Sequence, residues 1–177
     1  KWIGAPLGVG VLHIRHSRLD AIDRSLGDDP DGADAIHQRV HTGTTDMAAL
    51  LTLADALDFH QNIGVKAKEA RLRHLTARWT DRVRGAPGVE LLVAEDPRLR
   101  SALGSFRLAG RTSLADNRAL ARRLLDDFGI FTVERDGPAR GACVRATPGV
   151  FSAAADVDRL ADAIVAIARA AGPGIRP

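Results

Sequence analysis

The sequence has no tyrosine, a single cysteine and few aromatic residues, which make up 4% of its 177 residues. One cysteine excludes an intrachain disulfide framework and suits a reducing compartment, so we expect a cytoplasmic protein. No apolar run approaches the length of a transmembrane helix, so we expect no membrane partner. The sequence also lacks a large excess of charges of one sign. Because 25 basic and 22 acidic residues are interspersed, we expect no nucleic-acid partner.

Metal-binding patterns are weak. His37 and His41 are four residues apart, with Asp34 one turn earlier, a spacing that could present two imidazoles to zinc on a helix. The glutamate of a His-Glu-x-x-His motif is absent, however, and Gly43 would end such a helix soon afterwards. The acidic stretch 27–32 lacks the alternating ligands and final glutamate of a calcium-binding loop. We therefore expect no metal site and a solvated loop at 27–32.

The apolar residues, at 45%, are sufficient for a folded core. Their periodicity predicts helices at about 16–26, 46–62, 65–84, 114–128 and 154–171. Short apolar and β-branched runs predict strands at 9–14, 89–94, 105–108, 130–135 and 142–147. The breaker Ala-Pro-Gly at 86–88 places a domain junction, after which strands and helices predict a small α+β domain. Its helices should cover one face of a mainly antiparallel sheet.

Lys1 precedes a hinge rich in glycine and proline that runs to Gly10. Such a lysine can simply be a solvated charge. It can also be an amine held inside a site, where partial burial lowers the pKa of the ammonium and the free amine attacks a carbonyl. The residues of the hinge alone leave both interpretations open.

Gly43 and Thr44 lie immediately before the helix predicted at 46–62. Thr44 or Thr45 can serve as the N-cap of this helix. A helix N-terminus with free N–H groups and a threonine hydroxyl is equally a good phosphate site.

Arg145 lies near the end of the strand predicted at 142–147 and is followed by the turn at Pro148. Arginines at strand ends are usually surface ion-pair partners. A guanidinium fixed by a rigid turn can also hold a carboxylate in a two-pronged grip, and both roles are compatible with the sequence.

The first fifteen residues read Lys-Trp-x-Gly-x-Pro-x-Gly-x-Gly-x-Leu-x-x-Arg. This segment resembles the cofactor-lysine segment of class V aminotransferases, the fold-type I pyridoxal-phosphate enzymes, and is most similar to their isopenicillin N epimerase-like branch. The resemblance implies that Lys1 carries pyridoxal 5'-phosphate as a Schiff base. It also implies that Gly43 and Thr44 contact the cofactor phosphate of the neighbouring subunit, and that Arg145 binds the α-carboxylate of an amino-acid substrate. Sites shared in this way imply a homodimer.

The same resemblance implies an α/β fold of the fold-type I class, of which this chain forms the C-terminal half. Residues 1–86 would be the end of the large cofactor domain with its linking helix, and residues 87–177 the small α+β domain. His41, Thr45, Gly149 and Ser152 depart from the pattern of the epimerase-like branch. These departures leave the substrate open.

The position of the cysteine bears on the reaction. Cysteine desulfurases also resemble this chain, but their persulfide cysteine lies on a loop well before the arginine. Cys143 lies two residues before Arg145, within a predicted strand, and no cysteine precedes it. We therefore favour an epimerase or a C–S lyase over a desulfurase, with transamination still open. The alternative hypothesis is a catalytically inactive dimerisation or binding module of the same fold.

Overall fold

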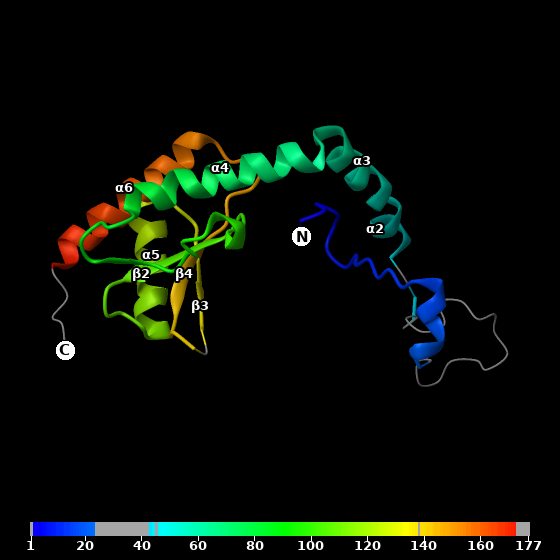
Figure 1. The fold of residues 1–177 in the computed structure, drawn as a ribbon, viewed down its shortest axis with the longest axis horizontal. Coiled ribbons are helices and arrows are strands. Elements are labelled where there is room, and N and C mark those ends of the chain that lie inside the picture. The colour runs from blue at the N-terminus through cyan, green and yellow to red at the C-terminus, as the bar shows by residue number, and fades with distance from the viewer. Residues whose placement is uncertain (1, 24–42, 45, 138, 173–177) are drawn as a thin grey trace. The chain divides into compact units, whose positions relative to one another are not determined.

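The structure, a computed structural model, describes residues 2–23, 43–44, 46–137 and 139–172 (Figure 1). Lys1, the histidine pair at 37 and 41 and the acidic stretch 27–32 lie outside the described residues. The chain divides into two compact units, Lys1–Ile63 and Gly64–Pro177, which we call unit 1 and unit 2. This division into compact units does not test the domain junction expected near residue 86, which stays a prediction.

Unit 1 contains the 3-10 helix η1 (His16–Ala21) and the helices α2 (Met47–Leu51) and α3 (Leu53–Ile63). Together α2 and α3 form the helical region predicted at 46–62, with a break at Thr52.

The predicted N-cap of this helical region was wrong. The cap is Asp46, whose carboxylate accepts a hydrogen bond from the N–H of Ala49 at 3.2 Å. A carboxylate at this position satisfies one of the free N–H groups of the first turn, as a threonine hydroxyl would. Thr44 therefore does not cap the helix.

The strand predicted at 9–14 was also wrong. No strand forms in this segment, and the side chains of Val11 and Leu12 are 61% and 60% exposed. A strand requires a partner for its backbone hydrogen bonds, and the described sheet contains only segments of unit 2. The apolar, β-branched composition is therefore not sufficient by itself to make this run a strand.

Unit 2 is built on a four-stranded sheet with the strand order β1-β2-β4-β3. All three pairings are antiparallel. Three strands are shorter than predicted: β1 (Val89–Leu91), β3 (Val133–Arg135) and β4 (Cys143–Ala146). The strand β2 (Gly104–Leu108) begins one residue earlier than predicted and is one residue longer. This arrangement agrees with the small α+β domain expected from the sequence.

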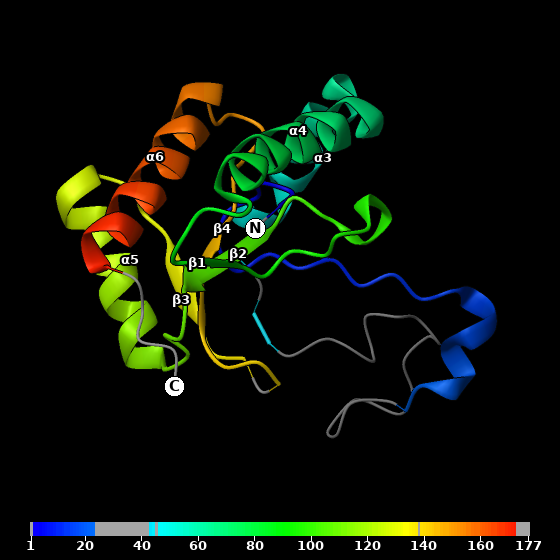
Figure 2. The same ribbon diagram turned by 60° about the vertical axis from the view of Figure 1, so that its left-hand side comes forward.

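Three long helices accompany the sheet: α4 (Val65–Val83), α5 (Leu114–Phe128) and α6 (Ala154–Ala171). A short 3-10 helix, η2 (Pro97–Leu99), lies between β1 and β2. Figure 2 shows α5 and α6 on the same side of the strands. The helix boundaries follow the sequence closely, because Ser113 caps the N–H of Asp116 and Gly129 ends α5 in the left-handed conformation.

The core of unit 2 lies between this sheet and the helices. Trp79 of α4 and Phe106 of β2 are fully buried and meet edge to face, with ring centroids 5.7 Å apart. Leu124, Val144 and Ile164 complete the buried centre. The indole of Trp79 lies directly over Gly104, where a Cβ atom would overlap its ring.

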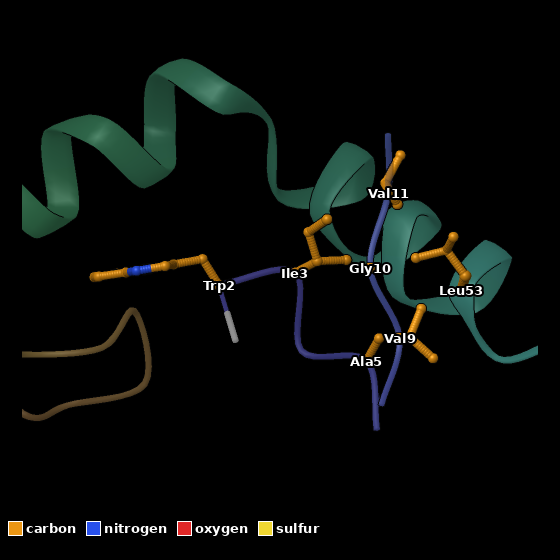
Figure 3. A pocket seen from close by; sticks show the side chains of 7 residues that line it. All are labelled: Trp2, Ile3, Ala5, Val9, Gly10, Val11 and Leu53. Carbon is orange, nitrogen blue, oxygen red and sulfur yellow. The ribbon is translucent and has the colours of Figure 1, made fainter. Parts of the chain in front are cut away.

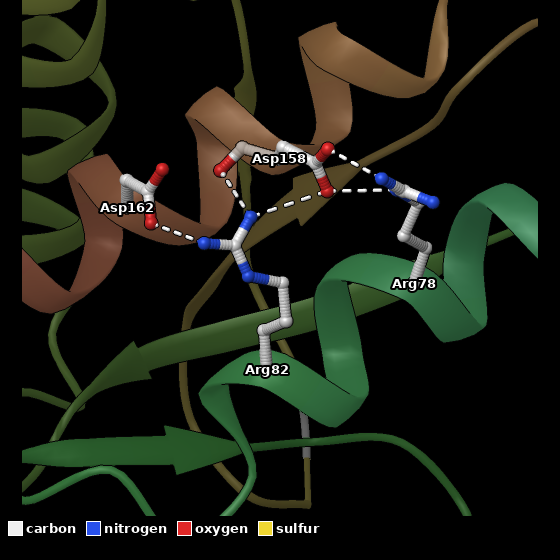
Figure 4. Close-up of polar contacts among 4 residues, drawn as sticks. All are labelled: Arg78, Arg82, Asp158 and Asp162. Atoms are coloured by element: carbon white, nitrogen blue, oxygen red, sulfur yellow. Dashed lines mark hydrogen bonds and ion pairs between the residues drawn. The ribbon is translucent and has the colours of Figure 1, made fainter.

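Ion pairs on the surface join α4 to α6 (Figure 4). Arg78 donates two hydrogen bonds to the carboxylate of Asp158, at 2.8 and 2.7 Å. Arg82 lies one turn further along α4 and pairs with both Asp158 and Asp162. The hydrogen bond from Arg78, reinforced by its charge, holds the pKa of Asp158 below its ordinary value of 3.8.

Replacing Gly104 by alanine should destabilise unit 2, because the added methyl group must displace a fully buried indole. We expect a loss of about 1–3 kcal/mol, the usual range for overpacking a core. Urea unfolding followed by the fluorescence of Trp79 measures it. The control is Gly10→Ala, where the added methyl group meets nothing within 4 Å. An unchanged midpoint for Gly104→Ala would contradict the packing described.

The pairs of Asp158 should make the stability of unit 2 depend on pH. Because the folded pKa of Asp158 is lowered, its contribution is complete above the ordinary value of 3.8 and is lost as the pH falls through the folded pKa. Asp158→Asn should therefore lower the melting temperature at neutral pH, and the difference from wild type should narrow below about pH 4. Asp127→Asn, which removes an exposed pair within α5, serves as control. A difference that does not vary with pH would exclude this cause.

Candidate functional site

Arg145 lies in β4, one of the two central strands of the sheet. It is paired with Ser105 of β2 on one side and with Val133 of β3 on the other. Its neighbours Val144 and Ala146 are buried in the core under the helices. Because successive side chains of a strand alternate between faces, Cys143 and Arg145 belong to the opposite face. We call this the open face; the register also assigns to it Glu90, Ser105, Arg107, Val133 and Arg135.

The side chain of Arg145 is half-buried, and its Nε atom is fully buried without a hydrogen-bond partner. No ion pair of Arg145 is found among the described residues. A buried donor left unsatisfied costs about 1–3 kcal/mol, and more when it carries charge. A carboxylate bound to the terminal Nη atoms of this guanidinium would neutralise its charge in a two-pronged geometry.

Arg107 is a second arginine of the open face, and its role is structural. Its Nε and Nη2 donate to the two carboxylate oxygens of Glu90 at 2.8 and 2.7 Å. Its Nη1 donates to the carbonyls of Arg140 and Ala142. This hydrogen bonding raises the pKa of Arg107 and lowers that of Glu90. Arg107 thereby anchors the connection 136–142, which leads from β3 into the strand that carries Arg145.

Arg107 was not among the site residues predicted from the sequence. Its place directly after a phenylalanine inside the predicted strand 105–108 does not distinguish it from a solvent-facing arginine. A charged residue at a strand centre usually faces solvent, and only the pairing of β1 with β2 reveals that this one is buried.

Cys143 is half-buried within β4 and is paired across the strands with Arg135. It is the single cysteine of the sequence, and it lies in a strand rather than on a loop. The connection that precedes it, 136–142, contains no thiol.

The hinge of unit 1 borders a small open cleft of about 300 Å³, into which backbone polar groups as well as apolar side chains are exposed (Figure 3). In Figure 3, Trp2 extends away from the other lining side chains. The residues that line the cleft are Trp2, Ile3, Ala5, Val9, Gly10, Val11 and Leu53. Lys1, the predicted cofactor lysine at the start of this hinge, is not among the described residues.

A histidine that was not predicted from the sequence contacts the backbone of the glycine-rich hinge. His60 of α3 contacts the carbonyl oxygen of Ile3 through Nε2 at 2.9 Å. Because a carbonyl only accepts, Nε2 must carry the proton and donate. No sequence signal indicated this contact, because it joins segments that are far apart in the chain. Its effect is to fix the backbone two residues after Lys1.

Gly43 and Thr44 are described on the chain leading to α2. Gly43 has a φ angle of 132°, a conformation that side chains rarely adopt, and Thr44 is exposed. They belong to unit 1 and Arg145 to unit 2. Their grouping with Lys1 into one site therefore stays a prediction.

Other site types find no support in the described part of the chain. There, no group of three or more His, Cys, Asp or Glu side chains could hold a metal ion. Among the same residues, no helix is both long and apolar enough to cross a bilayer.

Comparison with known families and proteins gives consistent matches. The family described as Aminotransferase class-V matches residues 1–160. Isopenicillin N epimerase of Streptomyces clavuligerus is 28% identical over 183 residues, covering 94% of this chain and 45% of that protein. Isopenicillin N epimerase of Amycolatopsis lactamdurans is 30% identical over 179 residues, covering 93% and 44%. The chain thus spans less than half the length of the curated relatives it matches.

Solved structures share the fold. The cysteine desulfurase CsdA of Escherichia coli matches with a TM-score of 0.76 at 23% identity, over 96% of this chain and 44% of that one. A cysteine desulfurase of Thermococcus onnurineus NA1 gives a TM-score of 0.74 at 20% identity, over 94% and 44%. The cystine C-S lyase C-DES, in complex with cysteine persulfide, gives 0.72 at 20%, over 93% and 44%. These likenesses confirm the fold class predicted from the sequence.

The hydrogen bond from His60 should control the order of the hinge. In His60→Leu the donor is lost, and backbone amides of residues 2–14 should exchange with deuterium faster than in wild type. His60→Gln places an amide N–H near the position of Nε2 and should restore slow exchange. Hydrogen-exchange mass spectrometry of the N-terminal peptides measures both variants. Equal exchange in the leucine and glutamine variants would show that the bond does not order the hinge.

Proposed function

The chain belongs to the class V aminotransferase family, and from this premise we propose that it forms part of a pyridoxal-phosphate-dependent enzyme acting on an amino acid or an amino-acid derivative. The isopenicillin N epimerases support the proposal as relatives. So does a C-DES variant, matched at 20% identity, in which glycine is covalently linked to the PLP cofactor. The activity is that of an assembly larger than this chain, which spans 44–45% of the length of these epimerases.

The observation that carries the proposal is the unsatisfied guanidinium of Arg145. Its buried Nε lacks a partner, on a strand whose register is fixed by neighbours on both sides. An α-carboxylate supplies two acceptor oxygens in the plane that a guanidinium requires. Arg145 would bind this group and orient the Cα–H bond of the substrate for proton removal.

The remaining roles fall to unit 1. Lys1 would attach the cofactor covalently through its ε-amine and then carry the proton to and from Cα. When bound, pyridoxal phosphate supplies the electron sink that stabilises the carbanion at Cα. Gly43 and Thr44 would offer backbone N–H groups and a hydroxyl to the phosphate bound by a second subunit. The proposed enzyme is accordingly a homodimer, and we place it in the cytoplasm.

Epimerisation or C–S bond cleavage fits the chain better than a desulfurase reaction through a protein persulfide. A persulfide-forming thiol must be accessible and able to reach the substrate. Cys143 is half-buried within β4, and the connection before it contains no cysteine. Epimerases and lyases need no protein thiol, and transamination remains a further route from the same carbanion.

Borohydride reduction tests the proposal directly. We expect the protein, purified in its longest natural form, to carry a reduced pyridoxyl group on Lys1 after treatment, as found by peptide mass mapping. Lys66 provides an internal control, because labelling there would indicate nonspecific attachment. An unmodified Lys1, in a protein without cofactor absorbance, would overturn the proposal. It would instead favour an inactive dimerisation or binding module of the same fold.

A further inference from the structure

Arginines gather on and beside the open face, and acidic side chains compensate only some of them. Glu90 pairs with Arg107 at 2.7 Å and with Arg140 at 3.5 Å. Arg135 and Arg145 also belong to the open face by the register of β3 with β4. Neither of these two has an ion-pair partner among the described residues.

The acidic residues beside Arg135 are engaged elsewhere. Glu134 pairs with Val144, so it belongs to the helix side of the sheet, where Arg118 of α5 binds its carboxylate at 3.1 Å. Asp136 accepts a hydrogen bond from the N–H of Gly137 at 2.9 Å. Arg135 itself is exposed and donates through Nη1 to the backbone carbonyl of Glu134. Its charge contributes, after the stronger hydrogen bonds, to the lowered pKa of Glu134, but Arg135 forms no ion pair among the described residues.

The register brings these two arginines close together. Arg145 is paired with Val133, and Arg135 is two residues further along the same strand. Such diagonal neighbours on one face are separated by about 7–8 Å, within reach of long side chains. Two guanidinium groups without ion-pair partners, carried by neighbouring positions of one sheet face, repel one another and attract a ligand with two acidic groups.

We infer that Arg135 and Arg145 form a two-point anion site, and that the substrate is an amino acid with a second carboxylate on its side chain. Arg145 binds the α-carboxylate, and Arg135 binds the distal one. This inference rests on the proposed function and adds the substrate class. Arg135 thereby distinguishes acidic substrates from neutral ones of the same length.

The test measures ligand binding without cofactor, so it does not depend on activity. The isotope-labelled chain is titrated at constant ionic strength with glutarate and with its monoamide, which has the same length and one carboxylate fewer. Amide chemical shifts of β3 and β4 report binding to wild type, Arg135→Gln and Arg145→Gln. Arg122→Gln removes an exposed arginine of α5 and serves as the control with the same loss of charge.

In wild type, glutarate should bind about tenfold more tightly than the monoamide, as expected for one additional guanidinium–carboxylate contact. Arg135→Gln should abolish this preference by weakening glutarate alone, whereas Arg145→Gln should weaken both ligands. Arg122→Gln should change neither. A preference that survives Arg135→Gln, or a wild type that does not bind glutarate, would overturn the inference. Failure of the proposed function is read separately, from the absence of borohydride labelling at Lys1.

Discussion

The geometry of the candidate site depends on the alternation of side chains along β4. Val144 and Ala146 are buried against the helices, and this burial fixes the opposite orientation for Cys143 and Arg145. A shift of the register by one residue would place a guanidinium in an apolar core and two apolar side chains on the open face. The packing energy of the core therefore determines where the proposed substrate-binding arginine lies.

The arginines of unit 2 illustrate how their surroundings separate structural from binding roles. Arg107 is buried, and Glu90 together with two backbone carbonyls satisfies its guanidinium. It therefore stabilises the sheet and has little left to offer a ligand. Arg145 is half-buried and has no ion-pair partner among the described residues, so its charge is available to a ligand. The two residues are of the same type and share the open face, yet only the second is suited to binding.

The relatives and the structural neighbours point to different reactions on one scaffold. The curated relatives are isopenicillin N epimerases, whereas solved structures with the same fold include cysteine desulfurases and a cystine lyase. The fold therefore does not select the reaction, which depends on a few side chains placed on it. In this chain the proposed roles rest on Arg145, whose guanidinium can hold a carboxylate, and on the position of Cys143 within a strand.

The sequence by itself determined the features that depend on near neighbours. The ranges of the long helices of unit 2 were predicted from it, because hydrophobic periodicity and capping act within a few residues. The hinge motif likewise indicated the family. Only the tertiary structure decided the features that need distant partners. The run 9–14 has no partner strand among the described residues. The burial of Arg107 requires β1, and the contact of His60 with Ile3 requires α3 to meet the hinge. Pairings of this kind follow from how the whole chain packs, which local patterns do not specify.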